Sequence, residues 1–310
     1  MAVTLADAAQ AYGSSKTEQN LTRLFMMLSP LLEEMPMRKI SGRVYRYAEE
    51  VTLPSVGWRP VYGSWTESSG AVVQKSENLF ILGGEVKIDP FIVETDDGAD
   101  FENRAVQIKL KQQAISNEFD RAVLEGDDRT NPDNMVGLRR RLSGSQVIVQ
   151  STTGAALTLA ALDQLIDAVP FPDDQKRLYM NRTLRRKVKT LVDAVGGSIL
   201  ISENRPTFGT QPMRYAGIPI RIMERSGDAS TILDFDEDPG DAGLDTASVY
   251  CIAWGYDAVH GFWNGKKPLS YDENPPDASL NQYVLRWESY IGMAIRHPRA
   301  AARLRGILNA

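Results

Sequence analysis

DDGADFENRAVQIKLKQQAISNEFDRAVLEG, residues 96–126, is the most regular stretch of the sequence. Its apolar side chains recur at alternating steps of four and three residues, which is the period of an amphipathic helix and not of a strand. Carboxylates at its start suit the free amides and positive dipole end of a helix, and Gly126 suits a left-handed cap at its end. The carboxylates are Asp96, Asp97, Asp100 and Glu102, and the stripe consists of Phe101, Ala105, Ile108, Gln112, Ile115, Phe119 and Ala122.

The length of this helix sets a requirement on the rest of the chain. About 25 residues form a rod of roughly 38 Å. One compact domain does not cover a helix of that length. We therefore expect a sheet on one side of it and irregular or intersubunit contacts on the other.

The composition is typical of a soluble globular protein with a large core. The chain has 310 residues, of which 43% are hydrophobic and 24% charged, and length alone favours about two domains. The net charge of -5 provides no overall basic field for nucleic acid. Cys251 is the single cysteine, which excludes an intrachain disulfide and a cysteine metal cluster. The sequence has no signal segment and no run of 18 apolar residues, so we expect a cytoplasm-like compartment and no membrane partner.

The N-terminal region leaves two interpretations open. LTRLFMMLSPLLEEMPM, residues 21–37, is apolar on much of its surface before Pro30 and Pro36 interrupt it. It is either an arm that lies on another subunit, with Leu24 and Phe25 as contact residues, or a terminal helix that covers the protein's own core.

From residue 42 to residue 93 the apolar period changes to two, which predicts a long two-way excursion of strands. Gly83 and Gly84 lie between two extended runs and indicate a hairpin. The middle of the excursion carries aromatic residues among Gly, Ser and Thr, with too few aliphatic residues to form a local core. We expect an arm that contacts another subunit; the alternative is a hairpin folded onto its own domain. The contact candidates in this region are Trp58, Arg59, Tyr62, Trp65 and Lys75.

The following region predicts a layered α/β unit. Within residues 155–251, helical patterns alternate with short strands, and ASVYCIAWG, residues 247–255, is apolar enough for a central strand. Arg139, Arg140 and Arg141 cannot share one helical face, which favours a solvated or intersubunit salt bridge over a phosphate site. The basic helix that begins near Arg182 is interpreted as a solvated surface.

The long alternating stretch NQYVLRWESYIGMAIRHP, residues 281–298, predicts late strands that pack across the long helix.

The sequence lacks the residue patterns of catalytic and metal sites. His260 and His297 have no metal-ligand spacing, and no nucleophile elbow, phosphate loop or dinucleotide fingerprint occurs. The acidic segment DFDEDPGD, residues 234–241, lacks calcium-loop spacing and is interpreted as a surface loop, with cation binding as the minor alternative. We therefore predict no catalytic residue, no cofactor and no metal, and a structural protein in place of an enzyme.

In order and spacing, several stretches resemble the major capsid proteins of tailed bacteriophages, which have the Hong Kong 97 fold. The resemblance covers nearly the whole chain and rests on LFILGGEVKIDPFIVE (79–94), ISNEFDRAVLEGD (115–127), NPDNMVGL (131–138), LTLAALDQLIDAV (157–169), RLYMNRTLRRKVKTL (177–191), MRYAGIPIRIMER (213–225) and VYCIAWG (249–255).

The resemblance implies an α+β fold and a self-assembling shell. The chain would build hexamers and pentamers of an icosahedral phage head around double-stranded DNA, within a virion assembled in the host cytoplasm. The implied parts are an N-terminal arm (1–41), an extended β-hairpin loop with flanking strands (42–93), the first part of a peripheral domain with the spine helix (94–150), an axial domain (151–255) and the return strands of the peripheral domain (256–310).

The resemblance also implies partners. These are other copies of the chain, a portal, a decoration protein, and packaged DNA bound without sequence specificity. About forty residues before the loop are too few for a fused scaffolding domain, so a separate scaffolding protein is expected. Some family members crosslink a loop lysine between subunits; Lys75 lies in that region, but its asparagine and glutamate partners have no match. An encapsulin-like nanocompartment shell and, from another class, a small-molecule α/β enzyme are the alternatives.

Overall fold

The structure, a computed structural model, describes residues 28–89, 103–194, 213–224, 232–238, 245–265, 268–274 and 282–309. Leu24, Phe25 and the four carboxylates that precede the long helix lie outside the described residues. The helices are α3 (Pro30–Glu34), α5 (Asn103–Glu125), α6 (Leu138–Arg141), the 3-10 helix η1 (Gly144–Gln146), α7 (Leu159–Asp167) and α8 (Arg182–Ala194). The strands are β1 (Met37–Lys39), β2 (Val44–Thr52), β3 (Ala71–Asn78), β4 (Phe80–Ile88), β5 (Val147–Val149), β6 (Lys176–Met180), β7 (Arg214–Tyr215), β8 (Ile218–Ile222), β9 (Thr246–Ala253), β10 (Val259–Asn264), β11 (Ser270–Asn274), β12 (Tyr283–Ile295) and β13 (Ala301–Leu308).

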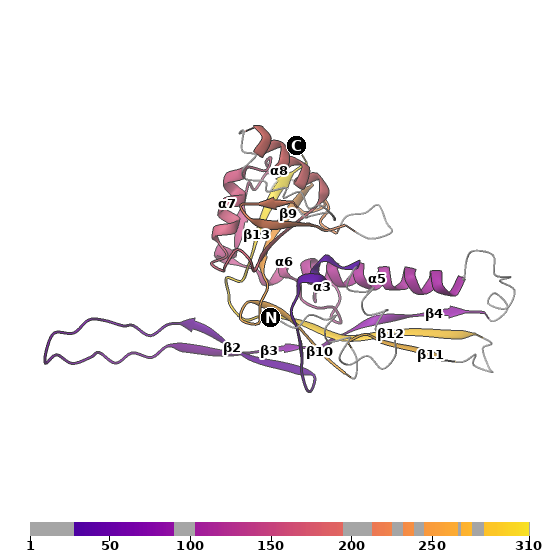
Figure 1. The fold of residues 1–310 in the computed structure, drawn as a ribbon, viewed down its shortest axis with the longest axis horizontal. Coiled ribbons are helices and arrows are strands. Elements are labelled where there is room, and N and C mark those ends of the chain that lie inside the picture. The colour runs from indigo at the N-terminus through magenta and orange to yellow at the C-terminus, as the bar shows by residue number, and fades with distance from the viewer. Residues whose placement is uncertain are drawn as a thin grey trace, which may run out of the picture.

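The long helix α5 lies along a five-stranded sheet, as its apolar stripe predicts (Figure 1). In this sheet β12 pairs with β4 along one side and with β10 and β11 along the other, and β1 joins β10. Ile115, Phe119 and Ala122 are buried on the helix, and side chains of β4 alternate between more and less buried positions. The helix packs against β4, which pairs with the late strand β12. Packing of the late strands themselves across the helix stays a prediction.

A six-stranded sheet forms the second layer system, in the order β5-β13-β9-β6-β8-β7. All eight residues of β9 are buried, which confirms the central position that its continuous apolar run predicts. α7 begins at the predicted cap, since the Thr158 side chain accepts a hydrogen bond from the Ala161 amide. α8 buries only Leu184, Val188 and Val192, so its basic side chains occupy the exposed face.

Strand pairing corrects the predicted grouping of residues 256–310 with the long helix. β13 pairs antiparallel with β9 and parallel with β5, so the last strand belongs to the six-stranded sheet. Ala301, Ala302 and Leu304 are fully buried there, because β13 lies between two neighbours. β5, which falls in the predicted range 94–150, belongs to the same sheet.

Two predictions about glycines are wrong. Gly83 and Gly84 form no hairpin but lie inside the continuous strand β4, and a Cβ on Gly83 would lie 2.1 Å from the carbonyl oxygen of Trp287. Gly126 is absent from the residues with positive φ, so it is no left-handed cap. A Cβ there would lie 2.0 Å from the carbonyl oxygen of Met135, and close backbone approach explains the glycine.

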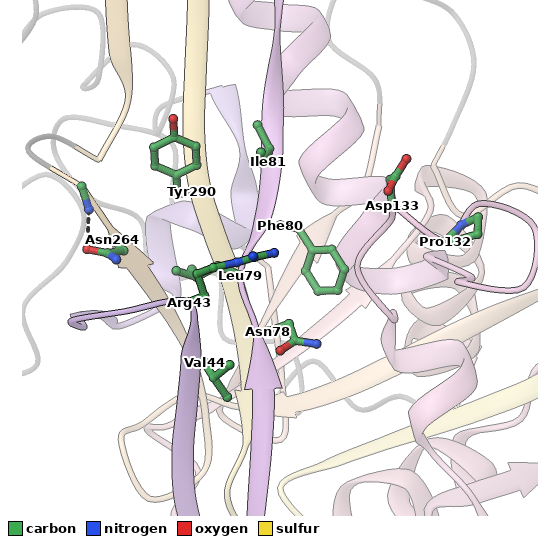
Figure 2. A pocket seen from close by; sticks show the side chains of 11 residues that line it. Arg43, Val44, Asn78, Leu79, Phe80, Ile81, Pro132, Asp133, Asn264 and Tyr290 are labelled. Carbon is green, nitrogen blue, oxygen red and sulfur yellow. Dashed lines mark hydrogen bonds between the residues drawn. The ribbon is translucent and has the colours of Figure 1, made fainter.

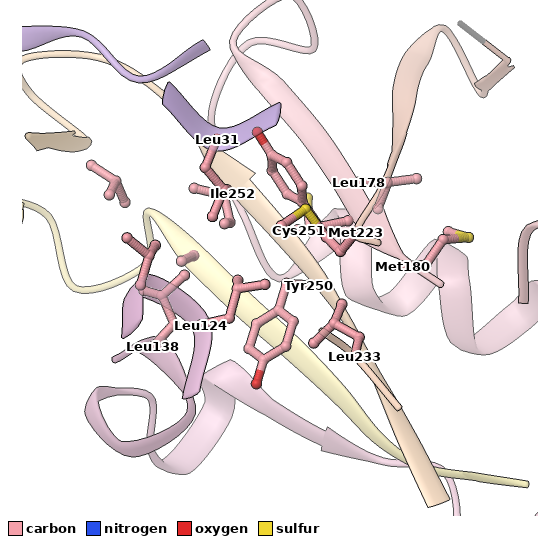
Figure 3. Close-up of a cluster of buried hydrophobic side chains, with 14 of the residues drawn as sticks. Leu31, Leu124, Leu138, Leu178, Met180, Met223, Leu233, Tyr250, Cys251 and Ile252 are labelled. Carbon is pink, nitrogen blue, oxygen red and sulfur yellow. The ribbon is translucent and has the colours of Figure 1, made fainter. Parts of the chain in front are cut away.

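One buried cluster joins both sheets, α5 and the N-terminal segment. Leu31 from α3, Leu124 from α5 and Tyr250 from β9 are fully buried within it (Figure 3). Glu34 extends this contact, since its carboxylate accepts a hydrogen bond of 3.1 Å from Arg221. For residues 30–34, the interpretation as a helix on the protein's own core is therefore the right one.

Candidate inter-subunit surface

The hairpin of β2 and β3 extends away from both sheets (Figure 1). The strands pair from Val44 opposite Asn78 to Thr52 opposite Ala71, and β3 is exposed at all but one residue. It does not fold back on its own domain. Such a hairpin gains little stability from core packing, so its anchor at the base decides its direction.

The base of the hairpin is held by an aromatic cluster and an ion pair. Tyr45 and Tyr47 stack with ring centroids 5.7 Å apart, and Tyr45 contacts the buried Phe262 ring at 5.0 Å. Arg141 donates two hydrogen bonds, of 2.6 and 2.9 Å, to the Glu77 carboxylate of β3. The bidentate geometry fixes the strand against α6. The predicted solvated or intersubunit role of Arg141 is therefore wrong, because its partner belongs to the same chain.

The tip, residues 53–70, is ordered by hydrogen bonds. The Ser68 hydroxyl donates to the Ser55 carbonyl at 2.8 Å, and the Ala71 amide donates to the Thr52 hydroxyl at 3.2 Å. A turn lies at its end, where the Gly63 amide donates to the Pro60 carbonyl at 3.0 Å. These bonds preorganise the tip before any partner is present.

Four predicted contact residues come together at this turn. Arg59 donates a hydrogen bond of 3.0 Å to the Gly63 carbonyl, and its guanidinium carbon lies 5.5 Å from the centre of the Trp65 ring. Trp58 and Tyr62 are fully exposed, with relative exposures of 102% and 99%, and Trp65 is 63% exposed. With Pro60 and Val61, these four residues line a shallow hollow.

The tip concentrates apolar surface that water disfavours. Six of the thirteen exposed large hydrophobic residues among the described residues belong to it. Removal of one such side chain from water is favourable by roughly 1.5–3 kcal/mol, before the costs of association are subtracted. Contiguous exposed patches of this kind mark interaction sites. The six residues are Leu53, Val56, Trp58, Val61, Tyr62 and Trp65.

The remaining predicted residues lie elsewhere. Lys75 is on the shaft of the hairpin, where it forms an ion pair with the buried carboxylate of Glu49. Sequence reasoning missed Leu53, Val56 and Val61, whose aliphatic side chains were taken as too few for a core and were not read as part of the surface.

A groove of about 1060 Å³ lies where the hairpin leaves the body of the protein (Figure 2). Phe80 and Ile81 from β4 line it together with Tyr290 from β12. Pro132 and Asp133, from the loop after α5, form the other side. The alternating apolar pattern of β4 did not predict this groove. Such a pattern shows that a strand has two different faces, but it does not show which face another part of the fold covers.

The acidic segment 234–241 is described as far as residue 238, and this part is not all on the surface. Glu237 is buried and accepts a hydrogen bond of 2.6 Å from Arg303, which corrects its interpretation as part of a surface loop.

Burial, together with the nearby carboxylate of Asp236, raises the pKa of Glu125 to about 7. No group of three or more His, Cys, Asp or Glu residues in the described part of the chain is arranged to hold a metal ion.

The two histidines serve local structure. His260 is buried, and burial with Arg38 and Arg296 nearby lowers its pKa to about 4. Its Nε2 lies 3.3 Å from the Tyr45 hydroxyl, within the aromatic cluster of the hairpin base. The ring of His297 accepts a hydrogen bond from the Arg299 amide at 3.1 Å.

Across the described ranges, no helix is long and apolar enough to cross a membrane.

Known proteins resemble this chain in structure, and they share little of its sequence. No family model and no curated protein matches the sequence. The capsid of a native GTA particle is similar over 91% of this chain and 91% of its own, with a TM-score of 0.65 and 13% identity. A structure from Microbacterium phage Oxtober96 covers 90% of each chain, with a TM-score of 0.63 and 14% identity.

The holo-SrpI encapsulin complex from Synechococcus elongatus PCC 7942 covers 100% of this chain and 98% of its own, with a TM-score of 0.61 and 13% identity. The chain has the Hong Kong 97 fold. The predicted α+β fold class is thereby confirmed. Because this fold is shared by phage capsids and encapsulins, the choice between them has to come from other observations.

Proposed function

We propose that this chain is the major capsid protein of a tailed bacteriophage, a structural protein without catalytic activity. It would assemble into hexamers and pentamers of an icosahedral head that encloses double-stranded DNA. The observation that carries the proposal is the projecting hairpin with its six exposed apolar tip residues, in a chain that has a shell fold. A monomer gains nothing from this surface, whereas a neighbouring copy would cover it.

The parts of the chain receive corresponding roles in this proposal. Residues 1–41 form the N-terminal arm, 42–93 the extended loop, and 94–150 the spine-helix part of a peripheral domain. Residues 151–255 form the axial domain, and β13 joins it because of its strand pairing. Trp58, Arg59, Tyr62 and Trp65 contact a neighbouring subunit, as do Lys75, Leu24 and Phe25. A scaffolding protein, a portal and a decoration protein complete the partners, and packaged DNA is held without sequence-specific contacts in a virion assembled in the host cytoplasm.

Electron microscopy of the full chain tests this function. We expect closed shells, or rings of subunits, when the chain is produced alone or with a scaffolding protein. Compact monomers at high concentration under both conditions would overturn the proposal. Turnover of a small molecule by such monomers would favour an enzyme on the same scaffold.

An encapsulin-like shell is the second candidate, because the encapsulin complex matches the full length of this chain. The contents of the purified shell separate the two. Packaged genomic DNA supports the capsid, and an enclosed enzyme supports the encapsulin.

A further inference from the structure

Helix α8 carries a local excess of positive charge beside the end of strand β13 (Figure 1). Five of its thirteen residues are cationic and one, Asp193, is anionic, although the whole chain has a net charge of -5. The five charges occupy about 10 Å of the helix axis. They belong to Arg182, Arg185, Arg186, Lys187 and Lys189, and none of these side chains is buried.

Four of these charges have no carboxylate partner in the described part of the chain. Arg182 forms an ion pair of 2.6 Å with Glu224, and the other four cations form none. The second basic run of the sequence differs, since Arg139, Arg140 and Arg141 each form an ion pair with a carboxylate of the same chain. The fold therefore neutralises one basic run internally and leaves the other open to an anion from outside.

The stability of the helix does not explain this run of cations. Arg182 and Arg185 lie in the first turn of α8, which contains no acidic residue. The positive end of the helix dipole repels cations there, so their placement is unfavourable for the helix alone. A bound anion would offset this repulsion.

A hollow of about 240 Å³ lies between α8 and the end of β13. Arg186, Lys187, Thr183 and Asn309 supply hydrogen-bond donors to it, and its described lining residues include no carboxylate. Phosphate oxygens accept hydrogen bonds, and they bind cationic donors most strongly. The same lining includes no aromatic ring on which an unpaired base could stack. It therefore favours the phosphate groups of a duplex over the bases of a single strand.

We infer that this face of α8, with the hollow beside it, binds the phosphate backbone of double-stranded DNA. The inference rests on the proposed function for the source of the DNA and adds the surface that contacts it. Duplex DNA carries one phosphate charge per about 1.7 Å of its axis, so about six phosphates lie along the 10 Å of the basic face. Contacts to phosphates carry no sequence information, so the binding is independent of sequence. Because the chain as a whole is acidic, the contact stays confined to this face.

Fluorescence anisotropy of a short labelled DNA duplex with the full chain tests the inference. With about four phosphates neutralised, the logarithm of the binding constant falls against the logarithm of the salt concentration with a slope of about -3.6. Arg186→Gln combined with Lys187→Gln is expected to weaken binding roughly tenfold and to bring the slope to about -1.8. The matched control is Arg46→Gln combined with Lys87→Gln, which removes the same charge from exposed positions on β2 and β4 and is expected to change neither quantity. Equal losses in the two double variants, or no loss in either, would overturn the inference.

A polyglutamate peptide separates DNA from an acidic polypeptide as the occupant of this face. The duplex is expected to bind more tightly, because its dense charge releases more counterions. Tighter binding of polyglutamate, lost in Arg186→Gln with Lys187→Gln, would assign the face to an acidic protein and overturn the inference.

DNA binding and shell formation can fail separately. Closed shells from a chain whose DNA binding does not depend on α8 would remove this assignment and leave the shell function standing. DNA binding through α8 by a chain that stays monomeric would retain the assignment and remove the shell function. Absence of both would overturn both.

Discussion

The Ser29 hydroxyl donates a hydrogen bond of 2.5 Å to the Asp120 carboxyl, and both side chains are buried between α3 and the C-terminal part of α5. Ser29 also caps α3, since its oxygen accepts a hydrogen bond of 3.0 Å from the Leu32 amide. Ser116 and Gln112 are buried one and two turns before Asp120. The hydrogen bond between Ser29 and Asp120 therefore joins the N-terminal segment to the long helix through two buried polar side chains.

Asp120 is expected to make the stability of the subunit fall as pH rises. Burial raises the pKa of Asp120 to about 8, against the opposing effect of the Ser29 hydrogen bond. Between about pH 4 and pH 8 the folded state keeps a proton that the unfolded state has lost, so the free energy of unfolding decreases by up to about 1.4 kcal/mol per pH unit. Asp120→Asn removes this contribution. Urea unfolding of isolated subunits at pH 5 to 8 measures the two slopes.

Glu125, whose pKa is also raised, contributes to the pH dependence of unfolding in both the wild-type chain and Asp120→Asn. The contribution of Asp120 is therefore the difference between the two slopes. Asp120→Ala is the control, because it removes the titrating group together with the hydrogen bond to Ser29. Equal slopes for the wild-type chain and Asp120→Asn would show that the carboxyl is ionised when buried.

Trp58→Asp and Trp65→Asp are each expected to leave the subunit folded and to prevent assembly. The two side chains are exposed in the isolated chain, so a charge there costs no core packing. In the proposed contact with a neighbouring subunit the charge would be buried, and loss of such an aromatic anchor raises the concentration for half-assembly by about 30-fold. Circular dichroism and sedimentation report folding and assembly separately. Trp287→Asp, at a fully buried position, is expected to unfold the chain.

The periodicity of apolar residues predicted most of the fold. Most of the wrong predictions concern contacts between residues that are distant in sequence. The stripe of α5, the apolar run of β9 and the cap at Thr158 are local patterns, and the structure confirms each. The prediction of a hairpin at Gly83 was wrong because the sequence alone does not distinguish a glycine required by a turn from a glycine required by the close approach of a neighbouring backbone carbonyl. β13 was misplaced because its partner strands are distant in sequence.

The candidate site divides in the same way. Aromatic residues without a local core predicted the tip from composition alone, and the structure places Trp58, Arg59, Tyr62 and Trp65 together there. The groove consists of residues from five separate stretches of the chain, so no window of sequence contains it.

Gly126→Ala is expected to destabilise the subunit by about 3 kcal/mol, since an added methyl group in a filled space forces the backbone to shift. The new Cβ would lie 2.0 Å from the Met135 carbonyl oxygen and 2.5 Å from that of Ala122. Gly57→Ala is the matched control, because nothing lies within 4 Å of its Cβ position. Its free energy of unfolding is expected to change by less than about 0.5 kcal/mol. Chemical denaturation of both variants measures the contrast, and similar losses would contradict the close approach of the two loops.

Glu237→Gln is expected to destabilise the subunit by about 3–5 kcal/mol, because it leaves the buried guanidinium of Arg303 without a compensating charge. Arg303 donates hydrogen bonds of 2.6 Å to Glu237 and 2.8 Å to the Ser248 hydroxyl, and both charged side chains are buried at the junction of β13 with the segment 232–238. The double variant Glu237→Gln with Arg303→Met removes both charges and is expected to recover most of the loss. A double variant as unstable as the single one would mean that packing, and not the unpaired charge, causes the effect. Urea unfolding of the two variants beside the wild-type chain decides between these causes.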